Sequence, residues 1–239
     1  MSFEPKNRAD RYTPEFFEGF AEDSARSSRV VLGHLFKRYQ PASVLDVGCG
    51  VGAWLDTAQK LGARAVRGLD GPWVKPEQLR IGAENFERID FEAKDWPEIR
   101  PVDLAMSLEV AEHLTPEAGA RLVTYLTESA PVVLFSAAIP GQGGEGHVNE
   151  QWQSYWAGRF AERGFRPSLA LRWAVWTDND VEFWYQQNLT LYAADSHAHL
   201  IEEATGPMDV IHPRLYDIRV LKRARRRARW RRFLPFLGK

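Results

Sequence analysis

The chain has 239 residues, with 31 lysines and arginines, 32 aspartates and glutamates, and one cysteine. This length fits one domain with extensions and argues against a second independent domain. No N-terminal apolar run resembles a signal peptide, no stretch is long and apolar enough to span a bilayer, and one cysteine fits a reducing compartment, so we expect a cytoplasmic protein.

The charges are unevenly distributed along the chain. Residues 220–239 hold nine lysines and arginines and no acid, which leaves 22 cations against 32 acids, or −10, for the first 219 residues. An acidic body does not predict a nucleic-acid footprint, whereas the basic segment could bind a polyanion.

The N-terminal region reads as helical. Thr13 followed by Pro14 is typical of a helix start, and a second helix is predicted from about Ala25 to Tyr39, stopped by Pro41. We therefore expect residues 1–40 to form a helical cap before the main domain.

Residues 44–55 predict a buried strand, a glycine-rich turn and the start of a helix. Gly48, Gly50 and Gly52 let the backbone bend sharply and approach a ligand closely, and Asp46 precedes them by two residues. A strand that leads into such a loop places a nucleotide at the carboxyl edge of a parallel sheet. Cys49, inside the loop, is interpreted as a small apolar filler rather than a nucleophile.

The following segments predict four more strands. Residues 64–70 end in Asp70, about twenty residues beyond the loop, where α/β nucleotide sites place the carboxylate that binds ribose hydroxyls. Residues 85–91 include the pair Asp90 and Phe91. Residues 102–114 form a strand leading into a helix, and residues 131–138 form the fifth strand.

These ordered motifs resemble the class I S-adenosylmethionine-dependent methyltransferases. The resemblance implies an α/β, Rossmann-like domain over residues 41–213, with a mainly parallel seven-stranded sheet and helices on both faces. It also implies S-adenosylmethionine as cofactor, with the following expected ligands: Asp46, Gly48, Cys49, Gly50, Gly52, Asp70, Asp90, Phe91 and Leu108.

The segment after the fifth strand is rich in glycine. Long glycine-rich loops at this edge of a sheet are more often functional than idle, so residues 139–156 are the expected acceptor lid. A helix is predicted over residues 151–163. Its aromatic residues are mainly core, although some could line a substrate; they are Trp152, Tyr155, Trp156 and Phe160.

The last third of the domain is predicted to close the sheet. We expect a strand over residues 166–175, a turn over 176–180, a helix over 181–185 and a final strand over 187–194. In the family that the motifs resemble, an added β-hairpin at the sheet edge is the usual ending.

Two histidines are the candidate catalytic residues. Methylation of a hydroxyl requires loss of its proton, and histidine titrates near neutrality, which favours His147 in the lid as general base, with His113 second.

The same region allows a metal site. The spacing of Glu109 and Glu112 places both on one face of a helix, with His113 alongside, and His147 could approach from the lid. The E-x-x-E-H pattern resembles the divalent-cation site, such as one for Mg²⁺, of ubiquinone-pathway O-methyltransferases and small-RNA 2′-O-methyltransferases. The alternative is that these glutamates only brace the loop.

Residues 147–156 resemble a segment of bacterial methyltransferases that act on glycans and specialised metabolites, which favours O-methylation of a sugar, glycan or small-molecule hydroxyl. An RNA ribose methyltransferase and a noncatalytic cofactor-binding module are the alternatives. Within the C-terminal region, residues 214–239, the basic stretch 220–239 ends in apolar groups, among them Trp230 and Phe233. It could attach peripherally to an anionic inner membrane face, remain solvated or, less favoured, contact nucleic acid.

Overall fold

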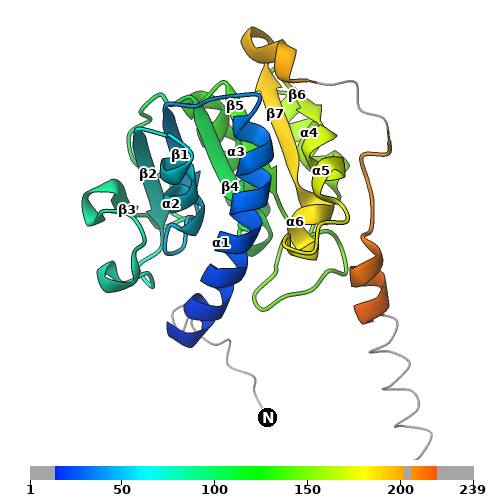
Figure 1. Ribbon diagram of the computed structural model, residues 1–239, viewed down its shortest axis with the longest axis horizontal. Coiled ribbons are helices and arrows are strands. Elements are labelled where there is room, and N and C mark those ends of the chain that lie inside the picture. The colour runs from blue at the N-terminus through cyan, green and yellow to red at the C-terminus, as the bar shows by residue number, and fades with distance from the viewer. Residues whose placement is uncertain (1–13, 202–205, 220–239) are drawn as a thin grey trace, which may run out of the picture.

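The computed structural model describes residues 14–201 and 206–219, and its centre is one seven-stranded sheet with the order β3-β2-β1-β4-β5-β7-β6 (Figure 1). The strands β1 to β5 pair in parallel, whereas β7 runs antiparallel to both β5 and β6. The strands are β1 (Ser43–Val47), β2 (Ala65–Asp70), β3 (Phe86–Arg88), β4 (Leu104–Leu108), β5 (Val132–Ser136), β6 (Phe165–Ser168) and β7 (Thr190–Ala194). The predicted fold class is confirmed.

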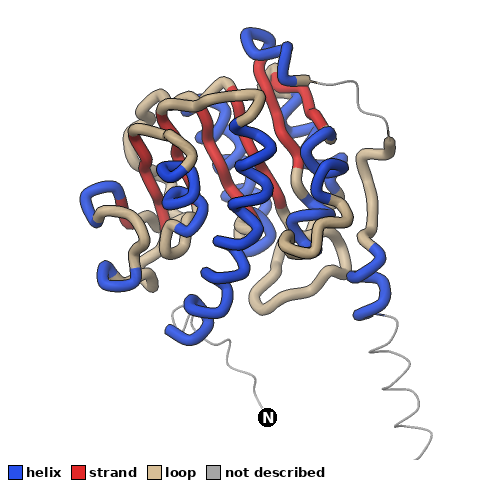
Figure 2. The backbone as a smooth tube through the Cα atoms, viewed as in Figure 1, coloured by secondary structure: helices blue, strands red, loops and turns tan. Residues whose placement is uncertain are grey.

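Helices cover both faces of this sheet (Figure 2). One face carries α1 (Pro14–Phe36), α2 (Ala53–Lys60), α5 (Ala170–Val175) and α6 (Phe183–Asn188), and the other carries α3 (Pro116–Ser129) and α4 (Gln153–Ala161). Short 3₁₀ turns lie at η2 (Pro76–Gln78), η3 (Ala83–Asn85), η4 (Ala111–His113) and η5 (Asp195–Leu200), and residues 213–219 are helical.

The two cores follow from the alternation of side chains along the strands. In β1, Val44 is buried with the helices of the first face, and its neighbour Leu45 is buried with those of the second. Because both faces are covered, these strands are apolar at nearly every position, as is typical of buried parallel sheets.

The N-terminal region forms one helix where two were predicted. Within α1, Ala21, Ala25, Leu32 and Leu35 are buried at spacings of 4, 7 and 3 residues, which are close to multiples of the helical turn, so a single apolar stripe continues past residue 25. The helix ends at Phe36, and the Tyr39 hydroxyl beyond it donates a hydrogen bond to the Asp103 carbonyl at 2.8 Å.

The predicted strand over residues 166–175 is also corrected. Only Phe165–Ser168 is extended, and α5 begins at Ala170. This helical turn buries Arg172, whose guanidinium donates to the Leu189 carbonyl, the Met208 carbonyl and the Thr190 hydroxyl at 2.8 to 2.9 Å. The strands β6 and β7 do pair antiparallel, but two short helices separate them, so they are not a simple hairpin.

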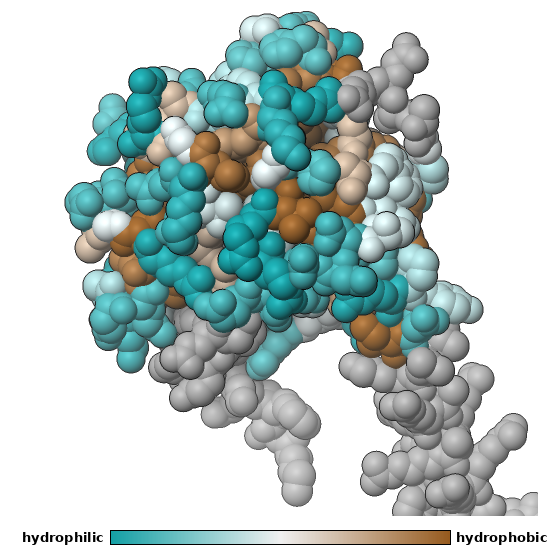
Figure 3. All heavy atoms as spheres, viewed as in Figure 1, coloured by the Kyte–Doolittle hydropathy of each residue, from teal (hydrophilic) through white to brown (hydrophobic). Residues whose placement is uncertain are grey.

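The face that carries α1 and α2 is covered mainly by hydrophilic side chains, with smaller hydrophobic groups between them (Figure 3). Among residues 14–201 and 206–219, no helix combines the length and the apolar character that crossing a bilayer requires. The basic segment 220–239 lies outside the described residues.

Candidate active site

A cavity of about 340 Å³ lies where the carboxyl ends of the central strands meet. Its walls come from the segments that follow β1, β2 and β4, from the loop after β5, and from residues of α1 and α6. Strands β1 to β3 are added toward one edge of the sheet and β4 and β5 toward the other, so the strand order switches direction between β1 and β4. Open α/β sheets bind their ligands at such a switch point.

The glycine loop between β1 and α2 has the backbone that its sequence predicts. Gly48, Gly50 and Gly52 have φ values of 88°, 54° and 82°, which other residues rarely adopt. A Cβ on Gly48 would lie 2.2 Å from a Val110 methyl carbon, so this position requires glycine for space as well. Gly48 and Gly50 line the cavity, whereas Gly52 turns the chain into α2 just outside the lining.

Asp70 holds the loop at the end of β2. Its carboxylate accepts hydrogen bonds from the Gly50 and Gly71 N–H groups, both at 2.6 Å, and from the Trp73 indole N–H at 2.8 Å. Burial raises the pKa of Asp70 to about 6, although these donors oppose the rise. Asp70 is therefore mainly ionised at neutral pH and lines the cavity as a hydrogen-bond acceptor.

Asp46 lies deeper in the same cavity. Burial, and then the negative charge of Asp70, raise the pKa of Asp46 to about 8. At neutral pH this carboxyl group is mainly protonated, so it can donate one hydrogen bond while Asp70 accepts them.

The raised pKa of Asp46 predicts a specific pH dependence of stability. A carboxyl group whose pKa rises on folding binds its proton more tightly in the folded state, so stability falls as pH rises toward the folded pKa. From pH 6 to 8, Asp46 is ionised in the unfolded chain and must take up a proton on folding, which should lower stability by up to about 1.4 kcal/mol per pH unit. Urea unfolding of the ligand-free Asp46→Asn variant should therefore show a flatter decline over this range.

The matched control is Asp178→Asn. Asp178 accepts a hydrogen bond from the Asp180 N–H in an exposed turn, so this variant should keep the wild-type slope. An equal slope in Asp46→Asn would contradict the assignment.

Among the predicted cofactor ligands Phe91, Leu108 and Asp90, two line the cavity and one does not. Phe91 and Leu108 are buried and line the cavity. Asp90 is exposed, its carboxylate accepts the Glu92 N–H at 3.0 Å, and it is outside the lining, so its contact with the cofactor stays a prediction.

Cys49 lines the cavity through its place in the loop, but its side chain packs into the core below. A Cβ on Gly68 would lie 2.6 Å from its sulfur. Burial raises the pKa of the Cys49 thiol well above its ordinary value, which favours packing over reactivity.

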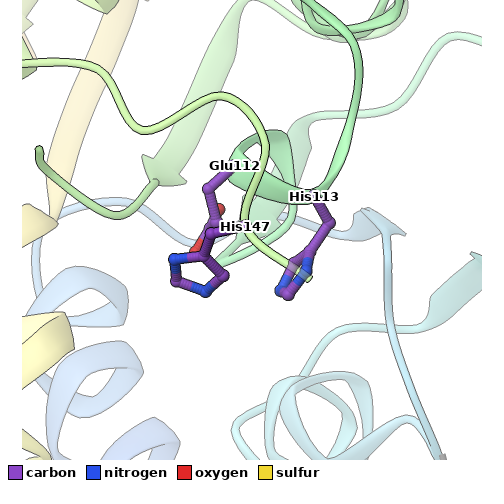
Figure 4. Close-up of side chains that lie close together, drawn as sticks. All are labelled: Glu112, His113 and His147. Carbon is purple, nitrogen blue, oxygen red and sulfur yellow. The ribbon is translucent and has the colours of Figure 1, made fainter. Parts of the chain in front are cut away.

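The end of β4 brings the predicted residues Glu109, Glu112 and His113 into the same cavity, and the loop after β5 adds His147. The helix expected at this point is a single 3₁₀ turn, and Glu109 precedes it with a φ of 57°. The two glutamates therefore do not share a helix face. Candidate ligand atoms of Glu112, His113 and His147 lie within 4.8 Å of one another, whereas Glu109 is outside this group (Figure 4).

Glu109 belongs to a network of buried amides. Its carboxylate accepts hydrogen bonds from Asn188 and Gln142, each at 3.1 Å, and Gln187 donates to the Gln142 side-chain oxygen at 2.9 Å. This network joins the end of β4 to the loop after β5 and to the end of α6. Burial raises the pKa of Glu109.

Glu112 is 1% exposed, and neither carboxylate oxygen makes a hydrogen bond of good geometry within the described residues. Burial, and then the charge of Glu109, raise the pKa of Glu112 well above its ordinary value. A buried carboxyl group in this state is costly unless a proton or a cation accompanies it. One carboxylate and two imidazoles suit a divalent cation, so the residues fit one.

His147 enters from the loop after β5, of which Gln142, Gly143, Gly144 and Glu145 also line the cavity. Its ring meets that of His113 edge to face, with centroids 4.8 Å apart. The Nδ1 atom of His147 lies 2.9 Å from the Glu150 carboxylate.

The aromatic wall of the cavity differs from the one considered in α4. Trp156 and Phe160 are buried against Phe135 in the core, and neither they nor Trp152 and Tyr155 line the cavity. The aromatic lining instead includes Trp54, Trp73, Trp184 and Tyr185.

Sequence reasoning missed these aromatic residues because their contacts are long-range. The Tyr185 hydroxyl, for example, is 3.1 Å from that of Ser24 in α1. Only the aromatic run of residues 183–185 could have drawn attention to them.

Comparison with known proteins agrees with this geometry. The family model described as a methyltransferase domain matches residues 20–204. A ribosomal protein L11 methyltransferase from Bradyrhizobium diazoefficiens is 28% identical over 155 residues, covering 55% of this chain and 52% of the relative. The chain thus spans about half the length of this curated relative.

Two solved structures show the same fold. Human N-acetylserotonin methyltransferase in complex with S-adenosylmethionine matches with a TM-score of 0.52 and 16% identity, over 79% of this chain and 57% of that protein. The sugar N-methyltransferase KedS8 from Streptoalloteichus sp. matches with a TM-score of 0.56 and 16% identity, over 75% and 91%.

Proposed function

The protein belongs to the class I S-adenosylmethionine-dependent methyltransferases, and from that premise we propose that it methylates a hydroxyl group of a sugar, glycan or other small molecule. One observation carries this proposal. A single cavity joins the glycine loop and Asp70, which suit an adenosyl group, to a cluster of imidazole and carboxyl groups that suit a hydroxyl acceptor.

Some of the residues that line the cavity would bind S-adenosylmethionine, and others would surround the acceptor. Asp70 and the glycine loop would hold the ribose, with Asp46 and Leu108 beside the donor and Phe91 against the adenine. The loop after β5 and the aromatic wall, with Trp184 and Tyr185, would surround the acceptor.

The chemistry needs a positioned hydroxyl and a destination for its proton. As the new C–O bond forms, the C–S bond of the sulfonium breaks, the neutral thioether leaves, and the hydroxyl proton passes to the His147 imidazole. Because Nδ1 of His147 faces Glu150, Nε2 is the nitrogen that would take this proton. His113 lies beside it and is the second candidate base.

We also propose that Glu112, His113 and His147 can hold a divalent cation such as Mg²⁺, in which case Nε2 of His147 is a ligand of the ion and not the base. Such an ion would supply a lowered pKa for a bound hydroxyl group. Glu109 would support Glu112 from the amide network without being a ligand in the present geometry.

The cation proposal predicts that Mg²⁺ or Mn²⁺ raises the melting temperature of the wild type but not that of Glu112→Gln. The reason is that Glu112 supplies the only carboxylate of the three-residue group. Glu117→Gln, at an exposed position in the first turn of α3, should keep the wild-type response. Equal stabilisation of Glu112→Gln would place any bound ion elsewhere and leave Glu112 as a structural brace.

The acceptor class can be tested with labelled S-adenosylmethionine and a matched panel. The panel pairs a sugar with its amino analogue and adds a single-stranded RNA and a ribosomal protein L11, because the names of relatives include a sugar N-methyltransferase and a protein methyltransferase. Label in the hydroxyl member alone supports the proposal. Label only in the amine, RNA or protein would overturn it.

A noncatalytic binding module is the remaining alternative. It predicts cofactor binding by calorimetry with no transfer to any member of the panel. Active transfer to one member would exclude it.

For the basic segment 220–239 we propose contact with an anionic membrane surface. Each lysine or arginine near such a surface contributes about 1 kcal/mol, and the aromatic groups can enter the interface. Truncation after Arg219 should therefore abolish cosedimentation with phosphatidylglycerol vesicles at low salt. Retained binding would refute a role for this segment.

A further inference from the structure

We propose that Glu150 is a positioning residue, which shapes the loop over the acceptor end of the cavity and fixes the orientation of the His147 ring with the same carboxylate. This inference rests on the proposed function, in which His147 uses Nε2 as base or ligand. Glu150 lies within the lid segment 139–156, but it was not among the candidate site residues that the sequence predicted.

Two backbone N–H groups and one imidazole nitrogen converge on this carboxylate. One oxygen accepts the Gly141 N–H at 2.8 Å, and the other accepts the Gly143 N–H at 2.6 Å and lies 2.9 Å from Nδ1 of His147. The side chains of His147 and Glu150 are only 12% and 20% exposed, so the pair is sheltered from solvent.

The backbone conformation of the loop after β5 allows these groups to converge on the Glu150 carboxylate. Gly141 and Gly143 have φ values of 83° and 62°, which turn their N–H groups inward around the carboxylate. Gly144 adds a close approach, because a Cβ there would lie 2.2 Å from Nε2 of His147. These glycines therefore let the loop pack closely around the side chains of His147 and Glu150, and their role is not only to make the loop mobile.

The backbone on either side of Glu150 is held in place by hydrogen bonds. The Val148 and Asn149 N–H groups donate to the Glu112 carbonyl at 2.8 and 3.0 Å, and the Gln151 N–H donates to the Ala138 carbonyl at 3.2 Å. The backbone around Glu150 is therefore tied to the turn after β4 and to the end of β5, next to the residues that face the acceptor.

The contact has a chemical consequence for the imidazole. A carboxylate only accepts hydrogen bonds, so Nδ1 must carry the proton that it donates to Glu150. The lone pair of a neutral His147 ring is then on Nε2, which is the tautomer required both for accepting a proton and for binding a cation.

The experiment uses Glu150→Gln in the full chain, with ¹⁵N-histidine labelling of the ligand-free protein. The glutamine keeps one oxygen for the Gly141 N–H, and its NH₂ group takes the place of the oxygen that faces both the Gly143 N–H and Nδ1. The Gly143 hydrogen bond is then lost, and an N–H donated to Nδ1 would move the ring proton to Nε2. The His147 signals are assigned by their loss in His147→Gln. We expect the Nδ1–H tautomer in the wild type and a shift toward Nε2–H in the variant.

The kinetic counterpart is a fall in kcat by about 10- to 100-fold, as is typical when a partner that orients a functional imidazole is lost. The KM for S-adenosylmethionine should stay unchanged, since Glu150 does not line the cavity. Glu162→Gln, at an exposed position after α4, should match the wild type in both measurements.

An Nε2–H tautomer in the wild type, or an unaltered tautomer in Glu150→Gln, would overturn the inference. So would a changed tautomer with unaltered kcat on the acceptor that the panel identifies. The tautomer is read without any acceptor, so a wild type that methylates nothing would refute the proposed function while the spectra still decide the role of Glu150.

Discussion

Asp70→Asn should weaken the binding of S-adenosylmethionine by about 100-fold or more. Hydrogen bonds to a charged group contribute about 1.5 to 3 kcal/mol each, and the carboxylate that we propose to accept both ribose hydroxyls loses its charge in the variant. The asparagine NH₂ group would also oppose one of the donors that now face Asp70, which are the N–H groups of Gly50, Gly71 and Trp73.

Isothermal titration calorimetry with S-adenosylmethionine and its demethylated product measures this effect directly. Asp195→Asn is the control, because Asp195 is exposed and lies at the far end of β7 in the first turn of η5. Circular dichroism of both variants shows whether the fold is retained. An affinity within threefold of the wild type for folded Asp70→Asn would refute the ribose contact.

The second large effect is expected for His147→Ala, in which kcat should fall by about 10²- to 10⁴-fold, the usual contribution of a general base. The KM for S-adenosylmethionine should change little, because we assign the glycine loop and Asp70, and not His147, to the cofactor. Initial rates with the hydroxyl acceptor from the panel give both constants. His199→Ala, at an exposed position in η5, is the matched control.

Rescue separates the two roles proposed for His147. Added imidazole can replace a missing base in the space left by the side chain, and we expect it to restore part of kcat in His147→Ala. If the residue acts only as a cation ligand, activity should respond to higher Mg²⁺ and not to imidazole. Unaltered turnover in His147→Ala would remove both roles.

The sequence predicted the parts of the site that depend on local geometry. The order of strand, glycine turn and helix specified the position of Gly48 and Gly50, since few residues tolerate their φ values. The strand ending in Asp70 then followed from distance along the chain, because β2 pairs with β1 in register and brings both carboxyl ends to one edge.

The incorrect predictions lie where tertiary contacts determine the backbone conformation. Residues 166–175 are a short, largely apolar run that fits a strand or a helix. In the helical conformation, the buried Arg172 donates hydrogen bonds to the Leu189 and Met208 carbonyls. Likewise, nothing local predicts a positive φ at Glu109, where the amide groups of Gln142 and Asn188 hold the carboxylate. Contacts this distant in sequence leave no periodic signal.

Because Cys49 is buried in the glycine loop, the reaction of its thiol can be used to measure how often this loop opens. It is the only cysteine in the sequence, and its thiol is buried beneath the glycine loop between β1 and α2. An alkylating reagent should reach it only when the loop lifts or the chain unfolds. The rate of mass increase under native conditions would then measure the free energy of that opening, and its slowing by a ligand would measure affinity without any label.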